Sequence, residues 1–122
     1  MPNANRVIVG CSHGDQEPDR VIVAYLTAVA ALDQGKEVVM WLTGDGVRLA
    51  TDGYAAPIRA GQEPPAQRMH EQFVEKGGRF YVCPICFNER DLDAAQLVDG
   101  AELKGATPLM EFAADGAMTF NY

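Results

Sequence analysis

Two cysteines separated by two residues are the clearest chemical signal in this chain. Cys83 and Cys86 form a CxxC motif directly after Arg79–Val82, a short apolar run of β type. A thiol pair at the end of a strand is suited to thiol–disulfide exchange, to carrying persulfide sulfur, or to supplying part of a metal site. The sequence contains no second CxxC, so a zinc ribbon is not indicated.

Further polar and thiol side chains follow two other predicted strands. Cys11 and His13 come after an apolar run at 6–10, and Asp45 lies in a Gly-Asp-Gly turn after a run at 37–43. The carboxyl ends of parallel strands meet at one edge of a sheet, so we expect these residues to converge on the CxxC thiols. There His13 is the nearest candidate base, and Cys11 and Asp45 are candidate substrate-binding residues.

A zinc site is an alternative interpretation of the same residues. Cys11, His13, Cys83 and Cys86 would supply three thiolates and one imidazole. The spacing between Cys11 and His13 is unusual for such a site, because a single intervening residue seldom lets both side chains reach one ion. Purely structural roles are also open, since cysteine packs readily as a small apolar residue and Asp45 is a typical turn residue. We therefore predict no cofactor, with zinc as the alternative.

Alternating strand and helix patterns surround these residues. Apolar runs predict strands at 6–10, 37–43, 79–82 and 117–120, and apolar periodicity predicts helices at 18–34, 65–76 and 107–113. A further short helix is predicted from Asp91 to Val98, with Asp91 as its cap. Strands that alternate with helices indicate an α/β fold with a mostly parallel sheet and helices on its faces.

The two longer predicted helices differ in their apolar pattern. The helix at 18–34 is apolar on almost all sides, which requires cover from its own domain or from another subunit. Its apolar run of about twelve residues is too short to cross a bilayer. The helix at 65–76 has a single apolar stripe with His70 at its edge, where we expect a packed histidine rather than a functional one. Between them, residues 51–65 are predicted to form a loop over the site.

Composition and charge narrow the classes of function. A chain of 122 residues, 48% hydrophobic and 22% charged, is expected to form a single domain over residues 1–122. Its net charge of −7 argues against binding nucleic acid or an anionic membrane through a basic face. An odd number of cysteines and the lack of a signal-peptide pattern favour a reduced, cytoplasmic protein. Nucleotide-binding and Ser-His-Asp hydrolase motifs are absent.

Taken in order, several segments of the sequence resemble the DsrE/DsrF-like family, which includes the sulfur-relay subunits TusD and DsrE. These segments are Val7–Val9, the Ala-rich helix followed by Gly35, the strand Val38–Leu42 with Asp45–Val47 after it, Lys76–Gly78, Val82–Cys83 and Val98–Ala101. The resemblance implies a three-layer α/β domain with a mostly parallel five-stranded sheet, one strand more than the residues alone predict. It also implies a homo-oligomer, commonly a trimer or hexamer, or a hetero-oligomer in the relay branch.

The same resemblance implies a role for the CxxC motif. In relay members a cysteine just after the strand accepts persulfide sulfur, and Cys83 matches that position. This implies a sulfur carrier or thiol-redox protein that acts through Cys83, with Cys86 as a resolving thiol and a sulfur donor or acceptor protein as partner. Cys86 is not part of the relay pattern, and the Arg-Gly pair of the relay branch reads Arg90-Asp91 here. A non-catalytic oligomeric binding protein is the alternative from another class, so whether the chain is an enzyme stays open.

Overall fold

A wholly parallel five-stranded sheet forms the centre of the protein in the computed structural model, which describes residues 5–122. The strands are β1 (Arg6–Cys11), β2 (Glu37–Leu42), β3 (Arg79–Val82), β4 (Ala101–Leu103) and β5 (Met118–Asn121), in the order β4-β3-β2-β1-β5. The α-helices are α1 (Pro18–Asp33), α2 (Ala66–Glu75), α3 (Pro84–Glu89) and α4 (Ala106–Phe112), and two 3₁₀ helices are η1 (Gly44–Ala50) and η2 (Ala94–Gln96).

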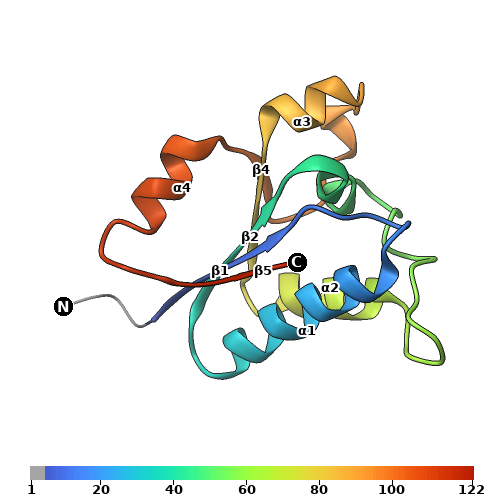
Figure 1. Cartoon of the computed structure of the whole chain (residues 1–122), viewed down its shortest axis with the longest axis horizontal. Helices are drawn as coiled ribbons and strands as arrows, with labels where there is room; N and C mark the ends of the chain where they lie inside the picture. Colours follow the sequence, from blue (N-terminus) through green and yellow to red (C-terminus); the bar gives the residue numbers. More distant parts are fainter. Residues whose placement is uncertain (1–4) are drawn as a thin grey trace.

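Helices cover both faces of the sheet, so the domain has three layers (Figure 1). Side chains alternate along β1: Val7, Val9 and Cys11 pack into the larger core beneath α1 and α2, whereas Ile8 faces α4. Parallel strands need crossover connections, and these connections place every strand's carboxyl end at one edge. The predicted fold class is therefore confirmed, including the fifth strand that only the family resemblance implied.

The apolar helix α1 is covered on its sheet-facing side. Val21, Ala24, Tyr25 and Ala28 are fully buried, but Leu26 on the outer side is 53% exposed. None of the helices in the described part of the chain is long and apolar enough to cross a membrane.

The helix predicted from Asp91 to Val98 is wrong. Asp91 adopts a left-handed backbone conformation with φ of 52°, which is incompatible with a helix cap in extended conformation. The helical residues lie on either side of it instead: α3 begins inside the CxxC motif, and η2 covers only Ala94–Gln96. The cap of η2 is Asp93, whose carboxylate accepts a hydrogen bond from the Ala95 N–H at 2.9 Å.

The strand β4 escaped detection in the residue pattern because it is short and polar. It has three residues, Ala101–Leu103, and pairs with β3 through Phe80↔Ala101 to Val82↔Leu103. Glu102, at its centre, is bonded to Arg79 of β3 at 2.7 Å. An edge strand carries a weaker apolar signal than the central strands, since it is buried on fewer sides.

Candidate functional site

The CxxC motif joins the end of β3 to the first turn of α3. The backbone N–H of Cys83 donates to the carbonyl of Leu42 at the end of β2, at 3.0 Å. Pro84 occupies the first helical position, where its fixed φ and missing N–H are tolerated, and the turn closes with a bond from Phe87 N–H to the Cys83 carbonyl at 3.0 Å. One turn of helix thus brings the two thiols of the motif to the same edge of the sheet.

The two thiols are free and partly exposed. Burial, together with the contact to Cys83, raises the pKa of Cys86, whereas a hydrogen bond from the Gly44 N–H and the nearby charge of Arg90 oppose the rise. The Cys86 thiol therefore holds its proton more tightly than an ordinary cysteine does.

Arg90 connects α3 to η1 beside the thiols. Its Nε donates to Asp45 Oδ1 at 2.9 Å, and its guanidinium also donates to the Cys86 carbonyl at 3.1 Å. The Arg90 hydrogen bond is the largest cause that holds the pKa of Asp45 below its usual range. Asp45, predicted as a binding residue, is thus paired with Arg90, and it also lines a cavity of about 250 Å³ with Arg48 and Tyr54.

The Gly44-Asp45-Gly46 segment uses its two glycines for different reasons. Gly44 has φ of 50°, a conformation that favours glycine, and its backbone N–H acts to lower the pKa of Cys86. Gly46 packs so closely on the backbone carbonyl of Cys11 that a Cβ atom would overlap it. A segment first interpreted as a simple turn therefore shapes the edge of the sheet next to the thiols.

Cys11 and His13 lie further along the same edge. Cys11 is buried, its Sγ donates to the His13 carbonyl at 3.4 Å, and burial raises its pKa. The Nδ1 of His13 lies 3.1 Å from the Tyr122 carbonyl oxygen, which can only accept, so Nδ1 carries the proton and Nε2 has a free lone pair. Because β2 lies between β1 and β3, two strand spacings of about 4.8 Å each separate His13 from Cys83 along the edge.

The residues of the alternative zinc site are not arranged to bind a metal ion in the described part of the chain. In residues 5–122, no group of three or more His, Cys, Asp or Glu side chains is placed to hold a metal ion. The set Cys11, His13, Cys83 and Cys86 therefore does not fit zinc as it stands.

Comparison with known proteins agrees with this architecture. The model of the DsrE/DsrF-like family matches residues 5–122. The chain belongs to this family. An uncharacterised protein of Methanopyrus kandleri, MK0008, is 29% identical over 97 residues, which are 80% of this chain and 77% of that protein.

Solved structures show the same DsrE-like fold. The crystal structure of the ychN protein from E. coli superposes with a TM-score of 0.78 at 18% identity, and covers 98% of this chain and 100% of its own. MTH1491 of Methanobacterium thermoautotrophicum, a protein of unknown function, gives a TM-score of 0.68 at 13% identity over 96% of this chain and 98% of its own. These likenesses establish the fold of this DsrE-like chain.

Sequence reasoning missed Arg90 and Gly44 as neighbours of the thiols. The sequence did contain a signal for Arg90. Proline after the first cysteine is typical of the first turn of a helix. In such a helix Arg90, four residues after Cys86, lies on the same face as Cys86. No sequence signal pointed to the Gly44 N–H, because that contact depends on how η1 packs against α3.

Proposed function

We propose that this DsrE-like protein carries sulfur or redox equivalents through Cys83, with Cys86 as the resolving thiol. The observation that carries the proposal is the position of two free, partly exposed thiols, one turn of helix apart, at the carboxyl edge of a parallel sheet. Membership in a family related to sulfur relay supports it. Cys83 is the nucleophile in this proposal because it matches the sulfur-accepting position of the relay members, whereas burial raises the pKa of Cys86.

The reaction begins with attack by the Cys83 thiolate on the outer sulfur of a donor persulfide. A new S–S bond forms on Cys83, the donor S–S bond breaks, and the donor leaves as its thiolate. The outer sulfur then passes to an acceptor thiolate, which regenerates Cys83. Alternatively, the Cys86 thiolate attacks the Cys83 sulfur, and hydrosulfide leaves while the Cys83–Cys86 disulfide forms. In that branch the outer sulfur is reduced and the dithiol is oxidised, so a dithiol reductant must restore the starting state.

His13 is the base in this proposal, and it acts through water. Its Nε2 has a free lone pair, but β2 separates its strand from that of Cys83. We expect His13→Gln to slow the alkylation of Cys83 at neutral pH. An unchanged rate of alkylation would remove His13 from the mechanism.

A sulfur donor or acceptor protein is the proposed partner. Ile85 lies between the two cysteines and is 70% exposed, so an apolar side chain stands at the entrance to the thiols. An apolar residue beside a reactive thiol suits contact with another protein surface. Free cysteines suit a reducing compartment, and we propose the cytoplasm.

A homo-oligomer, trimer or hexamer, is also proposed. An apolar groove of about 440 Å³ runs along the edge strand β5, with Leu26, Met118 and Phe120 among its lining residues. We expect Leu26→Arg to lower the molar mass in solution, whereas Met110→Arg, an exposed position on the opposite side of the sheet, leaves it unchanged. A monomeric wild-type protein would refute this part of the proposal.

Intact-mass analysis of reduced protein treated with a persulfide donor tests the function. We expect the mass of one added sulfur on Cys86→Ser, no added sulfur on Cys83→Ser, and a disulfide, seen as the loss of two hydrogens, on the wild type. Added sulfur that persists in Cys83→Ser would assign the chemistry to another residue. No change in any form would contradict the proposal and favour a non-catalytic binding protein.

A further inference from the structure

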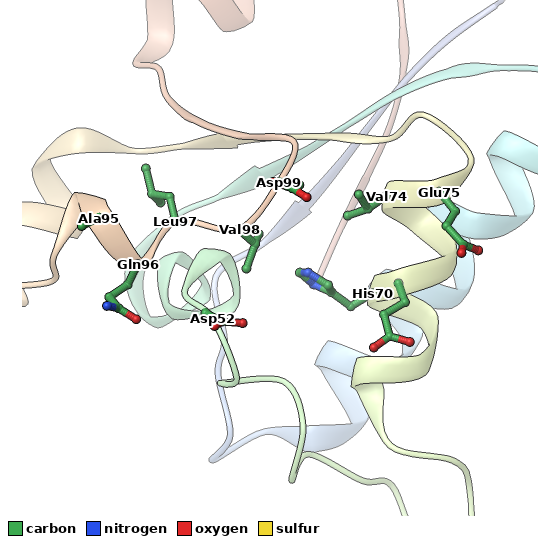
Figure 2. Close-up of a pocket in the computed structure, with 10 residues that line it drawn as sticks. Asp52, His70, Val74, Glu75, Ala95, Gln96, Leu97, Val98 and Asp99 are labelled. Atoms are coloured by element: carbon green, nitrogen blue, oxygen red, sulfur yellow. The ribbon is translucent and has the colours of Figure 1, made fainter.

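A second cavity lies on the α2 side of the sheet, formed without any of the three cysteines. Its volume is about 600 Å³, and its walls come from α2, from Asp52 and from residues 95–99 (Figure 2). Backbone hydrogen bonds hold these walls together, from Asp52 N–H to the Gln96 carbonyl at 2.9 Å and from Val98 N–H to the Ala50 carbonyl at 2.8 Å. The cavity is therefore built on ordered backbone and has the size of a small-molecule site.

Four carboxylates surround this cavity: Asp52, Glu71, Glu75 and Asp99. Among the described residues, no lysine or arginine lines it, and no ion pair engages any of the four. Glu71 accepts one hydrogen bond, from the uncharged amide of Gln67 at 3.2 Å. A cavity with negative walls and no internal cation selects a positively charged occupant.

His70 reaches into the same cavity from α2 (Figure 2). Only 5% of the surface of His70 is exposed, and its ring stacks on Phe80 with 5.1 Å between the ring centroids. The Nδ1 atom lies 2.8 Å from the hydroxyl of Tyr25, which is wholly buried. Within the described part of the chain, Nε2 of His70 has no hydrogen-bond partner. Every fully enclosed side-chain nitrogen or oxygen of these residues does have a partner, so Nε2 is not fully enclosed and opens onto the cavity.

The protonation of His70 follows from its contact with Tyr25. A buried phenol hydroxyl that donates no hydrogen bond costs stability. The hydroxyl of Tyr25 has His70 Nδ1 as its partner, so Tyr25 donates its proton to Nδ1. Burial holds the pKa of His70 below its usual value, although the charges of Glu71 and Asp52 oppose this. The neutral ring then carries its single proton on Nε2, and this N–H points at the space between the carboxylates.

We propose that this cavity binds a small organic ammonium ion that carries an oxygen acceptor. Its ammonium group would pair with Asp52 and Glu71 in the wall of the cavity, and its oxygen would accept the His70 Nε2–H. An inorganic cation bound directly by protein ligands is disfavoured, because no three side chains of the described residues are arranged to coordinate one.

Titration of the uniformly ¹⁵N-labelled full chain with L-lysinamide tests the proposal, because this probe has two amino groups and one amide carbonyl. We expect saturable shifts of the backbone amides of residues 52, 71 and 98 and of His70 Nε2. Asp52→Asn and Glu71→Gln should each weaken binding about threefold or more, the effect of removing one charge pair. Glu111→Gln, the same change on exposed α4 across the sheet, should have no effect.

His70→Asn separates recognition by the ring from charge attraction. The asparagine oxygen can take the place of Nδ1 as acceptor for Tyr25, but nothing replaces Nε2–H, so we expect about threefold weaker binding, as for one lost hydrogen bond, in a folded protein. Circular dichroism checks the fold. Shifts that do not saturate, or equal weakening by Glu111→Gln, would show general attraction to an acidic surface and overturn the proposal. Because no cysteine takes part, these results are independent of the sulfur chemistry.

Discussion

Removing the Tyr25 hydroxyl should destabilise the protein by more than a typical conservative change. Tyr25 is fully buried, and its hydroxyl is bonded to His70 Nδ1 at 2.8 Å. Tyr25→Phe deletes the donor and leaves Nδ1 unsatisfied in a ring that is 5% exposed. An unsatisfied buried acceptor costs about 1–3 kcal/mol. For a domain of 122 residues this corresponds to a fall in Tm of roughly 4–12 °C.

Thermal and urea unfolding measure this effect, and the chain contains a matched control. Tyr81 lies on the opposite face of the sheet, and no hydrogen bond of its hydroxyl is found among the described residues. Tyr81→Phe should therefore change the free energy of unfolding by less than about 0.5 kcal/mol. Equal effects of the two substitutions would refute the reasoning, because they would show that the Tyr25–His70 bond contributes nothing specific.

Three further predictions concern the backbone, the pH response and the thiols. Asp91 has φ of 52°, so Asp91→Gly should raise the free energy of unfolding by up to about 1 kcal/mol and Asp91→Ala should lower it, as urea unfolding can show. Burial lowers the pKa of His70 from its ordinary 6.5, so the unfolded chain binds this proton more readily. The free energy of unfolding should therefore fall as the pH drops below about 6.5, and His70→Asn should lose this slope in unfolding curves recorded across that range. The charge of Arg90 partly offsets the burial that raises the pKa of Cys86. In a Cys83→Ser background, Arg90→Gln should consequently move the alkylation of Cys86 to higher pH, and an unchanged alkylation profile would exclude this role.

Much of the fold was predictable because its signals are local. The buried strands β1, β2 and β3 are dense in β-branched and aromatic residues, and α1 begins with Pro18 and is followed by Gly35. The strand β4 lacked such a signal because it is a three-residue edge strand held by pairing with β3. Asp91 misled the prediction for a physical reason: aspartate is a common helix cap, but it also tolerates the left-handed conformation found here.

The candidate site was predictable in composition but not in its contacts. The CxxC spacing and the strand before it placed both thiols at the carboxyl edge, which the parallel topology confirms. The order of the strands decides which residues are neighbours, and that order could not be derived from local patterns. For this reason His13 was expected beside the thiols, whereas Gly44 and Arg90 make the contacts that the structure shows.

The stoichiometry of sulfide release tests the central claim most directly. Reduced protein would receive one equivalent of a persulfide donor, with sulfide and remaining thiols counted together. We expect one sulfide released for each Cys83–Cys86 disulfide in the wild type, and stable protein-bound sulfur without sulfide in Cys86→Ser. Sulfide release from Cys86→Ser at the wild-type rate, or disulfide formation without sulfide, would contradict a mechanism in which Cys83 accepts sulfur and Cys86 resolves it.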